Sequence, residues 1–214
     1  LLDNLAFFCS MKYPWIQIAQ QLQSIAQEGL TYTEGPFDRI RYTRLRELAV
    51  QVMADFSDTD METVKELFAS GTRYPTPKVD IRGVVIRDEK ILLVKEEDND
   101  LWSLPGGWAE VGLTPTENAV KEVREESGYE VEAVRLLAVW DKKCHPHPPE
   151  PDYAYKFAIL CKVVGGSRQI SIETTEVDWF GIDELPPLST NRNTEGQIRA
   201  AFEAAKENRS TTVD

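Results

Sequence analysis

The sequence predicts an α/β domain that follows a small all-α N-terminal domain. The first observation is a helical spacing of apolar residues that continues over residues 11–71. The second is a change to Val- and Ile-rich runs after the prolines at 75 and 77. The third is one helix with clear start and stop residues inside the strand-like region, and another helix at its end. Strands and helices in this order are typical of layered α/β proteins rather than all-β barrels.

The composition is that of a globular protein, with 214 residues of which 42% are hydrophobic and 28% charged. No run approaches the ~18 apolar residues of a membrane span, so we expect no membrane binding. The formal net charge of -12 argues against stable binding to nucleic acid, which needs a positive face. The scattered Cys9, Cys144 and Cys161 indicate free thiols in a reducing compartment, which predicts a cytoplasmic protein.

The N-terminal domain is expected over residues 11–74. Gly29 is expected to end its first helix, and Asp58 or Asp60 to cap the third. The apolar residues 1–10 lack the basic flank of a signal peptide, and we treat them as an extension ahead of Met11. The three helices are expected over residues 15–30, 35–57 and 58–71.

The α/β domain is expected over residues 75–214, because Pro75 and Pro77 form a linker that disfavours helix. Its first two strands are expected to form a hairpin around Asp88 and Glu89. Further strands are expected over residues 130–141, 152–164 and 177–182, and a closing helix over residues 194–208.

A short helix is predicted from residue 115 to residue 127. Thr114 and Glu117 form a capping box around a proline at the first helical position. Gly128 suits the left-handed conformation that ends a helix. At ~100° per residue, the apolar side chains fall on one arc and the acidic ones on another. The acidic arc consists of Glu122, Glu125 and Glu126.

This acidic arc is unfavourable in a plain helix. Glu122 and Glu126 repel each other at a cost of a few tenths of a kcal/mol, about the size of a favourable i,i+4 pair. Their position near the helix C-terminus adds ~0.3–1 kcal/mol per carboxylate. A bound divalent cation removes both costs, and Mg²⁺ suits such oxygen ligands, with Mn²⁺ as the alternative. The other interpretation is a solvated acidic face neutralised by Lys121 and Arg124.

The residues before the helix favour the metal site. From Gly107 onward the chain resembles the Nudix box of the Nudix hydrolases, whose pattern is Gly, five residues, Glu, seven residues, then Arg-Glu-apolar-any-Glu-Glu-any-Gly-apolar. The three glutamates, Val123, Gly128 and Tyr129 all fit this pattern. Leu113 stands where the pattern has Glu, and Lys121 where it has Arg. The resemblance extends over roughly residues 79–186, and a box of this length is a specific motif.

The resemblance implies an α/β/α sandwich with a mixed sheet, and the hydrolysis of a nucleoside diphosphate linked to another moiety. It implies a catalytic metal site and an attacking water, with Glu122 or Glu126 as the base. Lys121 would hold the catalytic carboxylate only as a point charge, because it lacks the fork of an arginine. The implied metal ligands are Glu122, Glu125, Glu126 and the carbonyl of Gly106.

Further site residues are expected outside the box. The family resemblance implies one more carboxylate from a distant loop, which Glu173 or Glu176 would supply unless both are ordinary loop charges. Arg82 is a candidate to bind a phosphate, or else to pair with an acid. Three aromatic residues are candidates to stack on a nucleobase, with packing in the core as the alternative. They are Trp140, Tyr153 and Tyr155.

The segments "LPGGWAEVGL", "VKEVREESGY" and "ELPPLSTNR", together with the N-terminal helices, resemble the Nudix group that includes bacterial CDP-choline pyrophosphatase. This implies CDP-choline as the substrate, with ADP-ribose or a nucleotide sugar as alternatives. Trimming of RNA ends as a side activity uses the same metal chemistry and is a third interpretation. The resemblance also implies a homodimer that involves the N-terminal helices, which otherwise serve as a lid over the substrate. The rival interpretation is a non-catalytic regulator that senses a nucleotide.

Overall fold

The computed structural model describes residues 14–57, 60–72 and 74–214, so the extension expected at residues 1–10 lies outside the described residues. The chain divides into two compact units. One unit is helical and comprises Leu1–Pro77 with the short segment Pro149–Tyr153. The other comprises Lys78–Pro148 and Ala154–Asp214 and contains the sheet.

The helical unit contains the three predicted helices, α1 (Pro14–Tyr32), α2 (Pro36–Asp55) and α3 (Met61–Ala69). Asp60 caps α3, because its carboxylate accepts hydrogen bonds from the first backbone N–H groups of the helix. The prediction that Gly29 ends α1 is wrong, since the helix continues to Tyr32. Gly29 instead leaves room for the ring of Tyr42, which would lie 2.4 Å from an added Cβ. The buried core of this unit consists of Ala19, Val50, Met53, Val64 and Ala69.

The sheet begins with the predicted hairpin, β1 (Lys78–Arg87) and β2 (Lys90–Glu96). Its two-residue turn places Asp88 and Glu89 at positive φ, as type I′ turns require. The later elements are β3 (Trp102–Ser103), β4 (Gly106–Trp108), α4 (Pro115–Ser127), β5 (Tyr129–Asp141), the 3₁₀ turn η2 (Lys142–Cys144), β6 (Ala154–Gly166), β7 (Thr174–Gly181), α5 (Glu195–Lys206) and β8 (Thr212–Val213).

The sheet is mixed, as predicted. Its hydrogen-bonded path runs β3-β2-β1-β6-β5-β8, and β4 and β7 pair with β1 and β2 respectively. The central strand β1 runs parallel to β6 and antiparallel to β2 and β4. In the register of β1 and β6, Asp80 lies opposite Lys156 and Arg82 opposite Ala158. Charged residues therefore occupy the middle of the sheet.

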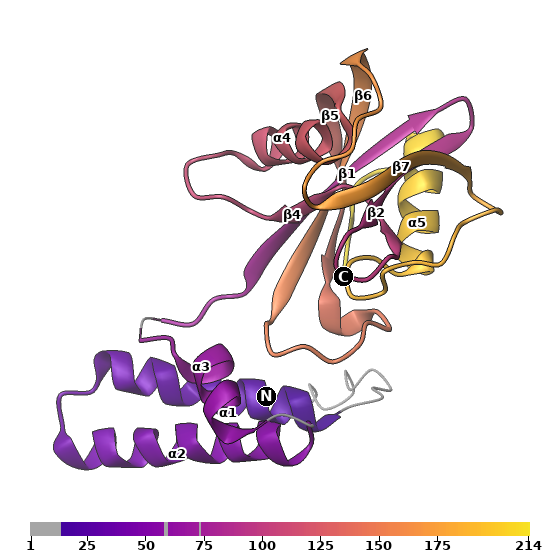
Figure 1. Cartoon of the computed structure of the whole chain (residues 1–214). Helices are drawn as coiled ribbons and strands as arrows, with labels where there is room; N and C mark the ends of the chain where they lie inside the picture. The colour runs from indigo at the N-terminus through magenta and orange to yellow at the C-terminus, as the bar shows by residue number, and fades with distance from the viewer. Residues whose placement is uncertain (1–13, 58–59, 73) are drawn as a thin grey trace. The chain divides into compact units, whose positions relative to one another are not determined.

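Helices cover both faces of this sheet, which confirms the sandwich architecture (Figure 1). Side chains alternate between the two faces along each strand, so neighbouring residues of β1 belong to different cores. The core under α4 includes Ile81, Val85, Ala119, Val123 and Ile159. The core under α5 includes Val84, Leu104, Trp140, Ala158 and Ile198.

None of the helices in the described residues is long and apolar enough to cross a membrane. The side chain of Cys144 is exposed and that of Cys161 is buried.

Candidate active site

The helix that carries the three glutamates is fixed at both ends, as predicted. The hydroxyl of Thr114 accepts a hydrogen bond from the backbone N–H of Glu117 at 3.2 Å, and the Glu117 carboxylate accepts one from the N–H of Thr114 at 2.8 Å. Gly128 ends the helix with φ of +76°. Its buried Val123 packs against the sheet. The caps therefore fix where α4 begins and ends, and its buried apolar residues set which side faces the sheet.

Gly106 begins β4, and only glycine fits there. Its φ is +142°, and a Cβ at this position would lie 2.0 Å from the carbonyl oxygen of Ile81. The backbone N–H of Gly106 donates a hydrogen bond to Oε2 of Glu126 at 2.9 Å. The close approach of β4 to β1 thus places a backbone donor directly on the last glutamate of α4.

Glu126 and Glu122 both lie in surroundings that disfavour a negative charge. Burial raises the pKa of Glu126 to about 8, although the Arg82 guanidinium and the Gly106 N–H act in the opposite direction. Burial also raises the pKa of Glu122, which Lys121 partly offsets. The Glu122 carboxylate lies 3.6 Å from the position of a Cβ on Gly107. The two glycines therefore line the space that both carboxylates face.

Of the three glutamates of the motif, Lys121 lies closest to Glu125. Its ammonium lies 2.6 Å from Glu125, 3.2 Å from Glu110 and 3.9 Å from Glu122. The hydrogen bond to Glu125 is the main reason why the pKa of Lys121 is raised. Glu110, which the motif did not indicate, is thus a second acidic contact of Lys121. The side chain of Glu125 is 57% exposed, so it can turn away from Lys121.

The two candidates for an outer carboxylate have different surroundings. Glu173 is close enough to Glu122 for its charge to contribute to the raised pKa of Glu122, after the larger effects of burial, Lys121, Glu125 and Arg82. Glu176 forms an ion pair with Lys95 at 2.9 Å. The charge of Glu173 therefore acts on Glu122, whereas Glu176 is paired with Lys95.

Arg82 pairs with an acid, which was the alternative to a phosphate-binding role. Its guanidinium donates two hydrogen bonds of 2.8 Å to the carboxylate of Asp80 and one of 3.1 Å to the carbonyl of Leu104. Lys156 lies 3.1 Å from the same carboxylate. Burial opposes the charge on Asp80, but the two cations outweigh it and hold the pKa of Asp80 below its usual range. With only 1% of Arg82 exposed, the guanidinium has no surface to offer a ligand.

The aromatic candidates are separated by the fold. Trp140 is buried in the core under α5, so packing in the core, rather than stacking on a base, describes its position. Tyr155 is exposed on β6. Tyr153 belongs to the segment of the helical unit, whereas Tyr155 belongs to the sheet unit. For both tyrosines, base stacking stays a prediction.

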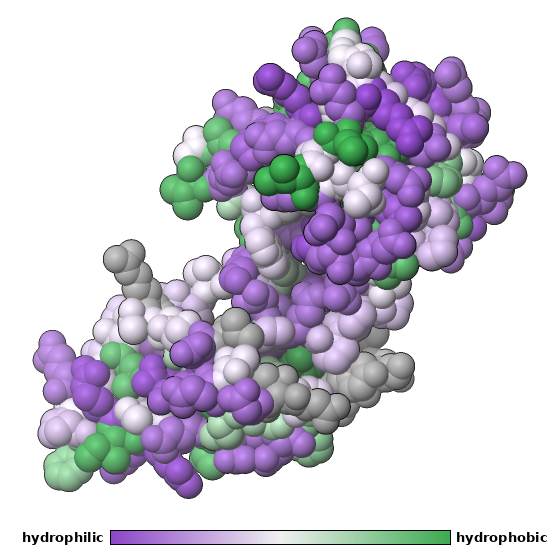
Figure 2. Space-filling view, viewed as in Figure 1, coloured by the Kyte–Doolittle hydropathy of each residue, from purple (hydrophilic) through white to green (hydrophobic). Residues whose placement is uncertain are grey.

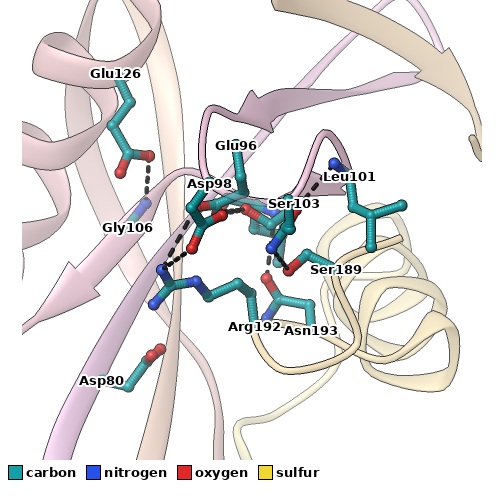
Figure 3. Close-up of polar contacts among 12 residues, drawn as sticks. Asp80, Glu96, Asp98, Leu101, Ser103, Gly106, Glu126, Ser189, Arg192 and Asn193 are labelled. Atoms are coloured by element: carbon teal, nitrogen blue, oxygen red, sulfur yellow. Dashed lines mark hydrogen bonds and ion pairs between the residues drawn. The ribbon is translucent and has the colours of Figure 1, made fainter. Parts of the chain in front are cut away.

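Besides Glu110, sequence reasoning missed four charged residues, which form two groups of contacts. Asp80 and Lys156 complete the buried cluster of Arg82. Glu96 accepts a hydrogen bond from the hydroxyl of Ser103 and lies 3.5 Å from Arg192 (Figure 3). The alternation of charged residues 80 and 82 within an apolar strand was a local sign of the cluster, but its partner on β6 depends on the strand register.

The donor chemistry fits a hard divalent cation. Glu122 and Glu126 are two largely buried carboxylates whose charges repel, and hard oxygen ligands of this kind suit Mg²⁺ or Mn²⁺. Within the described residues, no three acidic, His or Cys side chains already converge on one point, since Glu125 is turned to Lys121. Glu125 therefore has to leave Lys121 in order to join the other two.

Comparisons with known families match both units. The family model described as NUDIX domain matches residues 77–202. The model described as UDP-X-like, N-terminal oligomerisation domain matches residues 13–68. The chain is 47% identical over 189 residues to YjhB of Bacillus subtilis (strain 168), to which an ADP-ribose pyrophosphatase activity is provisionally assigned. That match covers 88% of this chain and 91% of YjhB.

Two solved structures are also similar. The crystal structure of UDP-X diphosphatase is 37% identical with a TM-score of 0.62, and the match covers 95% of this chain and 100% of that one. The crystal structure of an ADP-ribose pyrophosphatase from Streptococcus suis 89-1591 is 44% identical with a TM-score of 0.59. That match covers 65% of this chain and 100% of the other.

Proposed function

The chain belongs to the NUDIX family of hydrolases, and we propose that it cleaves the diphosphate bond of a nucleoside diphosphate linked to another moiety, with the help of Mg²⁺ or Mn²⁺. The observation that carries this proposal is the contact between the Gly106 N–H and the buried carboxylate of Glu126, beside Glu122. This contact supports the proposal, because it holds a buried carboxylate of the family motif against the glycine loop. Chelation is expected to abolish the activity.

The residues of the glycine loop and of α4 have different roles in the proposed reaction. Gly106 orients Glu126 through its N–H, and Lys121 pairs with Glu125, which would turn from this ammonium to bind the cation. Glu122 or Glu126 accepts the proton of the attacking water at a carboxylate oxygen. The divalent cation would be held by Glu122, Glu125, Glu126 and the Gly106 carbonyl. When bound, it would acidify that water and screen the charge of the diphosphate. Glu173 is the candidate for an additional ligand.

We propose a pyrimidine nucleotide conjugate as the substrate. CDP-choline is the substrate implied by the resemblance of the sequence, and the UDP-X diphosphatase that matches both units is also named for a pyrimidine nucleotide. ADP-ribose is the alternative, because two relatives carry that activity in their names. The regulator without catalysis is disfavoured, since all three glutamates of the motif are present.

A homodimer formed through the helical unit is part of the same proposal. Ile18, Ile25 and Tyr32 follow each other at seven-residue steps on α1, and each is more than half exposed. Seven residues are close to two helical turns, so these side chains share one face. Apolar patches are visible over the helices in Figure 2. A second copy of the chain would bury this face, in agreement with the name of the family model that matches residues 13–68.

A substrate panel tests the proposed function. The protein is incubated with Mg²⁺ and CDP-choline, a UDP-sugar, ADP-ribose or short RNA, and the products are separated by chromatography. We expect nucleoside monophosphate and the phosphorylated second moiety, fastest from the pyrimidine conjugates. Faster cleavage of ADP-ribose would contradict the pyrimidine preference alone. No cleavage of any conjugate would contradict the proposed function.

A further inference from the structure

The loop between β7 and α5 is tied to the strand that leads to Gly106. The backbone N–H of Trp102 donates to the carbonyl of Pro187 at 3.0 Å, and the N–H of Ser189 donates to the carbonyl of Trp102 at 2.8 Å. The Ser189 hydroxyl accepts a hydrogen bond from the side chain of Asn99 at 3.1 Å. Ser189 is buried. These contacts fix a loop that is distant in sequence beside the motif.

The next turn of this loop fixes Arg192. The N–H groups of Arg192 and Asn193 both donate to the Ser189 carbonyl, at 2.8 and 3.0 Å. The fully buried Asn193 accepts a hydrogen bond from the N–H of Leu104 at 3.2 Å. Leu104 precedes Gly106 by two residues, a backbone span of no more than ~7 Å. The anchor of Arg192 therefore lies close to the donor that holds Glu126.

The guanidinium of Arg192 is loosely held. It lies 3.5 Å from Glu96 and 3.7 Å from Asp98, and its side chain is 37% exposed. Charge-assisted hydrogen bonds are usually ~2.7–2.9 Å long, so these are weak contacts. Arg82, by contrast, is buried and bound by two hydrogen bonds of 2.8 Å. Figure 3 draws the Arg192 contacts in one view with the bond between Gly106 and Glu126.

Three other cations near the motif are engaged, and Arg124 lies ~160° around α4 from Glu126, on the other side of the helix. Lys121 contacts Glu125 and Glu110, and both Arg82 and Lys156 are buried against Asp80. A diphosphate that approaches Glu122 and Glu126 has the same sign of charge as these carboxylates, so a cation from the protein would assist its binding beside a bound metal. Among the described residues around the motif, Arg192 combines an anchored backbone with an accessible guanidinium.

We propose that Arg192 binds the diphosphate of the substrate. This assignment rests on the proposed function and names the side chain that recognises the substrate charge. The guanidinium exchanges its long contacts with Glu96 and Asp98 for paired hydrogen bonds to two phosphate oxygens, which suit its planar fork. The exchange leaves the metal ligands in place and orients the scissile bond toward them. Removal of Arg192 therefore weakens substrate binding more than it changes the folded structure.

The test compares Arg192→Ala and Arg192→Lys with Arg199→Ala in the full-length protein. Arg199 is a matched control, because it lies on α5 and pairs with Asp183 and Glu195 on the exposed surface. Two quantities are measured in Mg²⁺: the KM for CDP-choline or a UDP-sugar, and the Kd for α,β-methylene-UDP by calorimetry. We expect both to rise at least tenfold in Arg192→Ala and less in Arg192→Lys, and neither to change in Arg199→Ala.

Each outcome has a distinct meaning. If the wild-type protein hydrolyses the conjugates but Arg192→Ala has a KM and a Kd within twofold of wild type, the assignment of Arg192 is overturned. The proposed function then stands. Wild-type protein that cleaves no conjugate would overturn the proposed function, and this assignment with it. The melting temperature of each variant checks the fold, and Arg192→Lys keeps the charge if the alanine variant is unstable.

Discussion

At the scale of single residues, the centre of the sheet contains an ionic cluster that the site depends on. Asp80 forms ion pairs with both Arg82 and Lys156, each of which is almost fully buried. Arg82 also donates to the Leu104 carbonyl, two residues before Gly106. The charge of Arg82 lowers the pKa of Glu126 against the larger effect of burial. The cluster thus supports the loop and the carboxylate that the loop holds.

Asp80→Asn tests this cluster. The amide keeps the shape of the side chain but leaves two buried cations without a counter-charge, so we expect a loss of about 3–5 kcal/mol in the free energy of unfolding. Asp183→Asn is the control, because Asp183 is 88% exposed in its pair with Arg199 and should contribute less than ~1 kcal/mol. Both values come from urea denaturation. Equal losses of unfolding free energy in the two variants would show that the buried cluster stabilises the fold no more than an exposed ion pair does.

At the scale of elements, the site depends on the close passage of β4 against β1. Gly106→Ala would place a methyl group 2.0 Å from the Ile81 carbonyl oxygen, so the strand must move and the N–H must leave Glu126. We expect a loss of roughly 3 kcal/mol or more in stability, by analogy with other strained substitutions, and loss of hydrolysis.

Gly112→Ala is the matched control for this substitution. Gly112 also has a positive φ, of +98°, but an added Cβ would meet nothing within 4 Å. We expect a cost of ~1–3 kcal/mol from backbone strain, with hydrolysis retained. Thermal unfolding and product formation distinguish the two variants. Equal stability and activity in both would mean that the steric argument for Gly106 fails.

The elements whose determinants are local could be predicted from the sequence. The capping box at Thr114, the hairpin turn at Asp88 and the helix end at Gly128 each depend on a few adjacent residues, and all are present in the structure. The role of Arg82 could not be predicted in the same way. Whether it binds a phosphate or pairs with an acid depends on residues of neighbouring strands. Lys156 reaches Asp80 through the register of β1 and β6, which the sequence does not specify.

The candidate site shows the same division. The acidic arc of α4 and its glycine loop follow from spacing within one segment. Arg192 and Glu110 escaped notice because their positions depend on a distant loop and on the orientation of Lys121. The prediction that Gly29 ends α1 failed for a similar reason. Its weak helix propensity is a local property, whereas the packing of the Tyr42 ring against it is not.

At the scale of the whole molecule, the exposed apolar face of α1 predicts self-association. Ile25→Glu places a charge in the middle of that face and is expected to convert the proposed dimer to a monomer, as measured by light scattering during size-exclusion chromatography. Ile172→Glu is the control, because Ile172 is fully solvent-facing in the sheet unit, with 93% exposure. An unchanged mass for Ile25→Glu would assign the helical unit another role.

The central claim is that the acidic arc of α4 is a catalytic metal site, and Glu126→Gln tests it most directly. Gln keeps the size of the side chain and can still accept the hydrogen bond of Gly106, so the fold should survive. We expect turnover at saturating Mg²⁺ to fall on the order of a hundredfold or more, because the variant loses a charge aimed at the reacting diphosphate.

Glu117→Gln on the same helix is the control for this measurement, since its side chain serves the capping box and should leave turnover nearly unchanged. The measurement is the rate of nucleoside monophosphate release by wild type and both variants across a Mg²⁺ titration that begins in EDTA. The account predicts no release in EDTA, restoration by Mg²⁺ in wild type and Glu117→Gln, and little release by Glu126→Gln. Equal turnover in wild type and Glu126→Gln would show that the three glutamates are only a solvated face.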